Sequence, residues 1–168
     1  MFRKFVIRLL LSPFSLIYGT VISIINMFYQ IGLLKASRFS IPVIGVGNLS
    51  IGGAGKTPHI EYLIEMLKDF LDIATLSRGY KRQTQGFRFV TNEDTALTSG
   101  DEPLQYHRKY PDIIVAVGES RAYAIPQILQ RYPTIQAILL DDAFQHRAVE
   151  PGLNILLTAY DALFTDDY

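Results

Sequence analysis

The sequence predicts an α/β fold, in which a mostly parallel sheet with helices on both faces follows a separate apolar helix. Three observations predict it: short apolar runs alternate with segments of helical periodicity, a glycine-rich loop joins the first run to the first such segment, and an uncharged apolar stretch precedes them. Of the 168 residues, 49% are hydrophobic and 19% are charged, which is typical of a globular protein. The chain has no cysteine, so disulfides, thiolate metal sites and cysteine catalysis are excluded.

The N-terminal segment, residues 1–40, differs in charge from the rest of the chain. It carries five basic residues and no acidic one, whereas residues 41–168 carry 11 basic and 16 acidic residues. Residues 9–34 contain no charge over 26 positions, which is long enough to span a bilayer. Polar residues recur every three or four positions from Arg8 to Gln30, and a helix gathers them in one narrow stripe. We therefore predict an amphipathic membrane-associated helix in residues 1–40 and a globular part in residues 41–168.

Three placements of this amphipathic helix remain open. It lies in the membrane interface with its basic flanks at the headgroups, it spans the bilayer, or it packs on the protein's own core. Pro13 predicts a kink or break near its start. A cleaved signal peptide is not expected, because no small-residue cleavage site follows the apolar stretch. The basic segment on an acidic remainder favours an anionic membrane surface as partner, while the net charge of zero argues against nucleic acid.

The predicted elements of the globular part alternate along the chain. Strands are predicted where short apolar runs occur, at residues 41–47, 72–76, 86–90, 112–117, 137–140 and 153–158. Helices are predicted where apolar side chains recur at helical spacing, at residues 57–70, 102–110 and 119–132. Pro126 predicts a kink in the last of these helices. Continuous apolar strands separated by helices are typical of a parallel sheet covered on both faces.

The loop after the first predicted strand matches most of the P-loop pattern G-x-x-x-x-G-K-[ST]. Ser50 replaces the first glycine, whereas Gly55, Lys56 and Thr57 match. Between a strand and a helix, such a loop points backbone N–H groups at phosphate oxygens. We therefore predict that the α/β fold is P-loop NTPase-like. The predicted nucleotide-binding residues of the loop are Ser50, Ile51, Gly52, Gly53, Ala54, Gly55, Lys56 and Thr57. The alternative is an ordinary glycine turn followed by Lys-Thr by chance.

An acidic pair follows the predicted strand at residues 137–140. A P-loop enzyme needs a carboxylate at a strand end to hold the metal ion, and Asp141 is the better candidate. Asp142 is expected to alternate to the other face of the sheet or to turn into the next loop. Gln145 and His146 follow closely. The alternative is a solvated pair of carboxylates at the strand end.

Three further clusters lie where α/β enzymes place their chemistry, after the carboxyl ends of strands. Asp101 and Glu102 open a predicted helix, and they are expected either to cap it or to act as base and metal ligand. Arg121 lies in the first turn of another helix, where a cation is unfavourable unless it contacts an anion or forms a surface ion pair. Arg78 lies in a strand-end turn with the same two alternatives.

In order, the segments VGNLSIGGAGKTP, LSRGYKR, SGDEPLQ, VGESR and DDAFQHR resemble the tetraacyldisaccharide 4′-kinase (lipid A 4′-kinase) family. The resemblance covers the whole chain, including the apolar helix, and this family also tends to lack the first P-loop glycine. It implies transfer of the ATP γ-phosphate, with Mg²⁺, to the 4′-hydroxyl of a tetraacylated disaccharide 1-phosphate, the lipid A precursor. It also implies a location at the cytoplasmic face of the inner membrane of a Gram-negative-type bacterium.

The same resemblance implies roles for the candidate residues. The catalytic candidates are Lys56 and Asp101, the latter as the base that accepts the hydroxyl proton. The implied metal ligands are Thr57, Glu102 and Asp141, and Arg121 is expected to contact phosphate. Further residues expected to line the same site are Arg78, Asp142, Gln145 and His146.

Two features depart from the family pattern. Ala143 stands where the family commonly has glycine, and a positive φ there would be strained. The family also continues into a second α/β portion, which supplies a histidine partner for the catalytic Asp, so this chain is expected to correspond to the N-terminal half. Two other functions stay open: a membrane-associated P-loop ATPase of another kind, and an inactive nucleotide-binding fragment.

Overall fold

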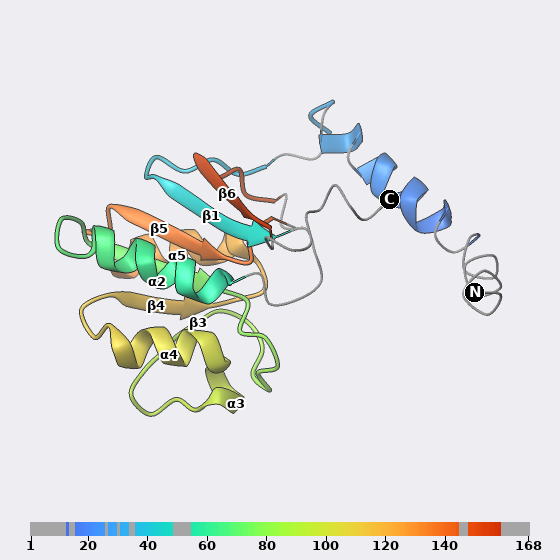
Figure 1. The fold of residues 1–168 in the computed structure, drawn as a ribbon. Helices are drawn as coiled ribbons and strands as arrows, with labels where there is room; N and C mark the ends of the chain where they lie inside the picture. Colours follow the sequence, from blue (N-terminus) through green and yellow to red (C-terminus); the bar gives the residue numbers. More distant parts are fainter. Residues whose placement is uncertain are drawn as a thin grey trace. The chain divides into compact units, whose positions relative to one another are not determined.

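The computed structural model describes residues 13, 16–25, 27–29, 31–33, 36–48, 55–144 and 148–158. The chain divides into two compact units, residues 1–36 and residues 37–168. The second unit contains the sheet and the helices that cover it (Figure 1).

In the described part of the chain, six strands form one sheet. The strands are β1 (Val43–Asn48), β2 (Ile73–Ser77), β3 (Arg88–Phe89), β4 (Ile114–Val117), β5 (Ala137–Asp141) and β6 (Leu153–Leu157). The helices are α2 (Lys56–Leu67), α3 (Ala96–Ser99), α4 (Asp101–Lys109) and α5 (Arg121–Arg131). The strand order is β3-β4-β2-β5-β1-β6, and every neighbouring pair is parallel except β3 with β4. The mostly parallel sheet predicted from the sequence is therefore confirmed.

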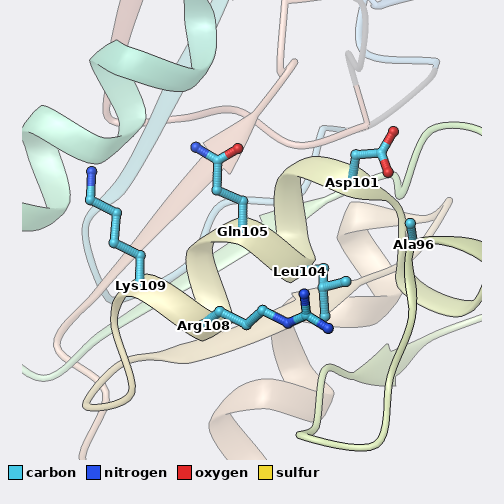
Figure 2. A pocket seen from close by; sticks show the side chains of 6 residues that line it. All are labelled: Ala96, Asp101, Leu104, Gln105, Arg108 and Lys109. Atoms are coloured by element: carbon cyan, nitrogen blue, oxygen red, sulfur yellow. The ribbon is translucent and has the colours of Figure 1, made fainter.

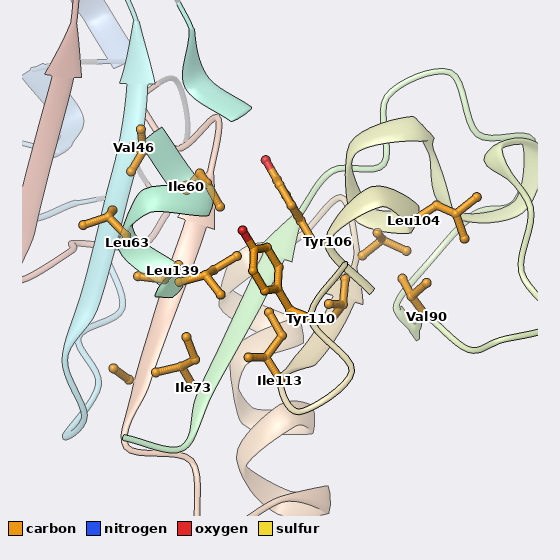
Figure 3. Close-up of a cluster of buried hydrophobic side chains, with 14 residues drawn as sticks. Val46, Ile60, Leu63, Ile73, Val90, Leu104, Tyr106, Tyr110, Ile113 and Leu139 are labelled. Atoms are coloured by element: carbon orange, nitrogen blue, oxygen red, sulfur yellow. The ribbon is translucent and has the colours of Figure 1, made fainter. Parts of the chain in front are cut away.

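Helices cover both faces of the sheet, because successive side chains of a strand point to opposite sides. On one face, Ile60 of α2 and Tyr106 of α4 join a buried cluster with Leu139 of β5 (Figure 3). On the other face, Ile125 of α5 joins Leu140 of the same strand. Consecutive residues of β5 thus serve two cores, and the prediction of helices on both faces is confirmed.

The parallel arrangement brings the carboxyl ends of neighbouring strands to one edge of the sheet. The register pairs Val46 of β1 with Asp141 of β5, and Ser77 of β2 with Val117 of β4. At this edge α2 begins after Gly55, which has a φ of 75°. Glycine adopts that left-handed conformation without the steric penalty of a side chain. The topology therefore brings the ends of β1, β2, β4 and β5 and the start of α2 to one edge of the sheet.

Three local features differ from the prediction. The four-residue helix α3 was not predicted, because it is too short to show periodicity; it begins where the Thr95 N–H donates to Thr98 Oγ1. The strand predicted at 86–90 is reduced to two residues that pair antiparallel with β4. The helix predicted at 57–70 ends at Leu67. Pro126 lies inside α5 as expected, and the kink at this residue stays a prediction.

The first unit is helical at residue 13 and over residues 16–25 and 27–29. Large apolar side chains of these turns are exposed, including Leu16, Ile17 and Val21. Among the described residues there is no helix with the length and apolar character needed to cross a membrane. Much of the predicted amphipathic helix lies outside the described residues, and its association with a membrane stays a prediction.

Candidate active site

A pocket of about 540 Å³ lies at the carboxyl edge of the sheet, and we call it the Lys56 pocket. Its lining comes from the ends of β2 and β5, the loop after β2, and the first turns of α2 and α4. The lining residues are Lys56, Thr57, Ser77, Arg78, Gly79, Tyr80, Glu102, Asp141 and Asp142. Six of the residues predicted from the sequence to form the site therefore share one pocket: Lys56, Thr57, Arg78, Glu102, Asp141 and Asp142.

Lys56 is the first residue of α2, and its side chain reaches back to the strand ends. Its ammonium group donates to Asn48 Oδ1 at 2.8 Å and lies 3.2 Å from Asp142 Oδ1. Asn48 ends β1 and Asp142 follows β5. These two contacts hold the cation of Lys56 over the edge of the sheet, where a phosphate group at the start of α2 would meet it.

The two adjacent carboxylates have different surroundings. Asp141 is buried at the end of β5, and its Oδ2 accepts a hydrogen bond from the Tyr106 hydroxyl at 3.1 Å. Burial, together with the nearby charges of Glu102 and Asp142, raises the pKa of Asp141 to about 6. Asp142 has a φ of 55° and is exposed, so the chain turns there into the following loop rather than continuing the strand.

Three oxygen-bearing side chains of the Lys56 pocket fit a magnesium ion. Thr57, Glu102 and Asp141 offer one hydroxyl and two carboxylates, and Mg²⁺ commonly takes one or two protein carboxylates and completes its shell with water and phosphate oxygens. No cluster of three His, Cys, Asp or Glu side chains suited to hold a metal occurs among the described residues.

Arg121 is buried instead of lying on the surface. Its Nη1 donates to the Gly118 carbonyl at 3.0 Å and its Nη2 to the Asp141 carbonyl at 3.1 Å. Burial lowers the pKa of Arg121 to about 10. The surface ion pair left open by the sequence is therefore wrong, because the helix turn that carries Arg121 packs against the sheet. The guanidinium connects the ends of β4 and β5, and its contact with phosphate stays a prediction.

Asp101 lines a different pocket, of about 560 Å³, which we call the Asp101 pocket (Figure 2). All of its lining residues belong to α3 and α4: Ala96, Asp101, Leu104, Gln105, Arg108 and Lys109. Gln105 and Lys109 donate from this side to Glu61 of α2, each at 2.7 Å, and so connect the two helices. The adjacent Glu102, by contrast, lines the Lys56 pocket.

The loop after β2 is packed tightly where it passes Gly79. Gly79 has a φ of 72°, and a Cβ there would lie 2.8 Å from the Ser99 carbonyl oxygen. Arg82 then connects the loop to the start of the next segment by donating to the Gly86 carbonyl at 2.6 Å and pairing with Glu119. Arg78, which precedes Gly79 in this loop, lines the Lys56 pocket.

Sequence reasoning missed several polar residues at the site. Asn48 and Ser77 are the last residues of β1 and β2, and their strand-end positions were a usable signal. Tyr106 lies four residues after Glu102 on α4, so both side chains lie on the same side of the helix. Tyr80 had no signal beyond its place in the turn after β2.

Some predicted residues lie outside the described part of the chain. These are Ser50, Ile51, Gly52, Gly53 and Ala54 of the loop after β1, and Gln145 and His146 after β5. The strain anticipated at Ala143 does not occur, because the positive φ falls on Asp142 instead. Ala143 itself is buried against the α5 face of the sheet.

Comparison with known proteins identifies close relatives. A family model described as "Tetraacyldisaccharide-1-P 4'-kinase" (LpxK) matches residues 7–168. A tetraacyldisaccharide 4′-kinase from Bacteroides thetaiotaomicron is 52% identical over 158 residues, which is 94% of this chain and 42% of the relative. Another from Flavobacterium johnsoniae is 50% identical over 162 residues, which is 96% of this chain and 48% of the relative. The chain thus spans about half the length of the curated relatives it matches.

A solved structure shares the fold. The crystal structure of the "apo" form of LpxK from Aquifex aeolicus in complex with ATP has a TM-score of 0.82 and 38% sequence identity. The match covers 92% of this chain and 50% of that one. From the family match over nearly the whole length, the chain belongs to the tetraacyldisaccharide-1-P 4′-kinase family.

Proposed function

We propose that this chain carries the ATP-binding part of a kinase that phosphorylates the 4′-hydroxyl of a tetraacyldisaccharide 1-phosphate. One observation supports this above all: Lys56, Thr57, Glu102 and Asp141 converge in one pocket at the carboxyl edge of a parallel sheet. The family membership names the reaction, and the A. aeolicus relative was crystallised with ATP.

In this proposal, each polar group of the Lys56 pocket has a task. Lys56 neutralises the β- and γ-phosphates of ATP, exchanging its contact with Asp142 for phosphate oxygens. Backbone N–H groups of residues 50–55 and of the first turn of α2 hold the phosphates. Thr57, Glu102 and Asp141 hold Mg²⁺, which when bound neutralises the charge that develops on the transferred phosphoryl group.

Asp101 is the proposed base. It accepts the proton of the sugar hydroxyl as that oxygen attacks the γ-phosphorus, and ADP leaves. The proposal draws on its position, because Asp101 and Glu102 are consecutive residues in the first turn of α4.

The first unit is proposed to associate with the anionic cytoplasmic face of the inner membrane of a Gram-negative-type bacterium. Its exposed apolar side chains, and the four basic residues that it carries without any acidic one, support this. A chain that starts at Ser40 should float less with anionic vesicles, since each basic residue near such a surface contributes about 1 kcal/mol. Equal flotation of the shortened chain would place the membrane contact elsewhere.

The test of the kinase proposal is ATP-dependent phosphorylation of the disaccharide lipid. We expect the full-length B. thetaiotaomicron relative to phosphorylate it, and the 168-residue chain to bind ATP while turning over very poorly. Release of phosphate from ATP at the same rate with and without the lipid would instead favour an ATPase. Rapid lipid phosphorylation by the 168-residue chain would refute the expectation that this chain is insufficient.

A further inference from the structure

A buried tyrosine lies directly behind the wall of the Lys56 pocket. Tyr106 is 1% exposed and belongs to the core between α2, α4 and the sheet (Figure 3). Its hydroxyl donates to Asp141 Oδ2 at 3.1 Å. The other carboxylate oxygen of Asp141 accepts no hydrogen bond from any described residue. One oxygen of this carboxylate is thus held, and the other is left for a ligand.

The same tyrosine touches both helices that form the pocket. The Thr57 side chain, at the start of α2, is near enough to the Tyr106 hydroxyl to lower its pKa, against the larger opposing effect of burial. Tyr106 also lies one turn after Glu102, on the same side of α4. Tyr106 is thus a neighbour of Thr57, Glu102 and Asp141, the three side chains that fit a cation. It does not itself line the Lys56 pocket.

A second tyrosine shows that this arrangement is not a general feature of the core. Tyr110 follows α4 by one residue and is 3% exposed, in the same buried cluster. Its hydroxyl has no hydrogen-bond partner among the described residues. Two tyrosines of similar burial, four residues apart, therefore differ in whether the hydroxyl contacts a predicted metal ligand.

The main chain of Asp141 is held as well. Arg121 donates to the Asp141 carbonyl from the opposite face of the sheet. With the backbone fixed by Arg121, the orientation of the carboxylate depends on its own side-chain torsions and on the Tyr106 hydroxyl. A hydrogen-bond partner of this kind fixes the direction in which a ligating carboxylate faces.

We propose that Tyr106 is a positioning residue, whose hydroxyl holds one oxygen of Asp141 so that the other faces the cation that accompanies ATP. The inference rests on the proposed function. It means that the Tyr106 hydroxyl controls how strongly magnesium increases the affinity for ATP. Tyr106 touches neither nucleotide nor cation and acts only through Asp141.

The test compares ATP affinity with and without Mg²⁺, measured by calorimetry on the 168-residue chain. In Tyr106→Phe, we expect the magnesium-dependent gain in ATP affinity to fall about tenfold, as for other partners of metal ligands. Affinity for metal-free ATP should stay within about twofold, because Lys56 and the loop backbone remain. Tyr110→Phe is the matched control, and it should leave both affinities unchanged, since its hydroxyl has no partner to lose.

A double-mutant cycle separates positioning from a general loss of packing. In the Asp141→Asn background, Tyr106→Phe should have no further effect on the magnesium-dependent gain. A fall of equal size in that background, or no fall in Tyr106→Phe alone, would overturn the inference. If the unsubstituted chain binds no ATP, the proposed function fails first and the inference fails with it; that outcome differs from binding that Tyr106→Phe leaves unchanged.

Discussion

The first turn of α4 contributes to two pockets that differ in how they are built. Glu102 lines the Lys56 pocket, which four elements and a loop surround, whereas Asp101 lines a pocket formed by α3 and α4 alone. In the Lys56 pocket, Lys56 and Asp141 both have partners. In the Asp101 pocket, Gln105 and Lys109 donate outward to Glu61 of α2, whereas neither Asp101 nor Arg108 has a hydrogen bond or ion pair with a described residue.

This difference follows from the topology of the sheet. Parallel strands deliver their carboxyl ends to one edge, so residues distant in sequence meet there and neutralise one another. The outer side of α4 gains no such convergence, because consecutive turns of one helix supply most of its lining. The Lys56 pocket is therefore assembled from several elements of the sheet edge, while the Asp101 pocket is lined by two consecutive helices.

Among the substitutions that test the difference between the two pockets, Lys56→Ala should have the largest effect. It removes the cation that is proposed to neutralise the β- and γ-phosphates, so phosphoryl transfer by a full-length enzyme should fall by orders of magnitude. ATP affinity, measured by calorimetry on this chain, should fall as well. The unfolding temperature should change little, because Lys56 is partly exposed and its ion pair with Asp142 is accessible to solvent. Near-normal turnover would contradict the assignment of the Lys56 pocket to nucleotide.

Asp101→Ala probes the other pocket. We expect it to abolish lipid phosphorylation in a full-length enzyme, since no other group is proposed to accept the proton. ATP affinity should stay within a few-fold, because Asp101 does not line the Lys56 pocket. A collapse of ATP affinity would instead assign Asp101 to nucleotide or metal binding. Arg108→Ala, in the same pocket, is a control for general disturbance of that side of α4.

Much of the fold was predictable because its signals are local and strong. The apolar run that became β5 and the periodic segment that became α5 differ enough in length and spacing to be told apart. Lys56 and Thr57 were predictable because the P-loop pattern combines a specific spacing with a strand before it and a helix after it. Asp141 was predictable as a strand-end acid near such a loop.

The rest depended on contacts that no local pattern encodes. For Arg121, in the first turn of α5, the sequence left a contact with an anion and a surface ion pair open, whereas tertiary packing buries its guanidinium, which donates to two backbone carbonyls. In the sequence, Tyr106 cannot be told from an ordinary core residue. Only the structure reveals its hydrogen bond to Asp141, 35 residues away. The sequence could not show that Asp101 and Glu102 line different pockets, because this depends on the residue at which α4 begins.

Arg121→Met tests whether the buried guanidinium stabilises the strand ends beside the Lys56 pocket. The substitution keeps an unbranched apolar side chain but leaves the carbonyls of Gly118 and Asp141 without their donors. We expect the free energy of unfolding to fall by about 2 kcal/mol, measured by urea denaturation. Arg108→Ala on the surface of α4 should change it by less than about 0.5 kcal/mol. Equal effects of the two would mean that the guanidinium does not hold the strand ends.

The smallest effect is expected at Asp94, which precedes α3 and so supports one side of the Asp101 pocket. Burial by itself raises the pKa of Asp94, but hydrogen bonds from Thr98 and Thr91 and the charge of Arg88 outweigh it and leave the pKa below its usual value. The Asp94 carboxylate therefore stabilises the folded state at any pH above about 4, the pKa of an Asp in the unfolded chain. This stabilisation is lost as the pH falls through the lower pKa that Asp94 has in the folded state.

Asp94→Asn should accordingly reduce the free energy of unfolding at neutral pH by about 1 kcal/mol, with urea denaturation as the measurement. It should also make the stability less dependent on pH below about 4, since the substituted side chain does not titrate. Glu93→Gln is the neighbouring control on an exposed carboxylate, with no such network. ATP affinity should not change in either variant, because α3 does not contribute to the Lys56 pocket. If Asp94→Asn weakened ATP binding as much as it weakened folding, the two pockets would not be independent, and the contrast between them would fail.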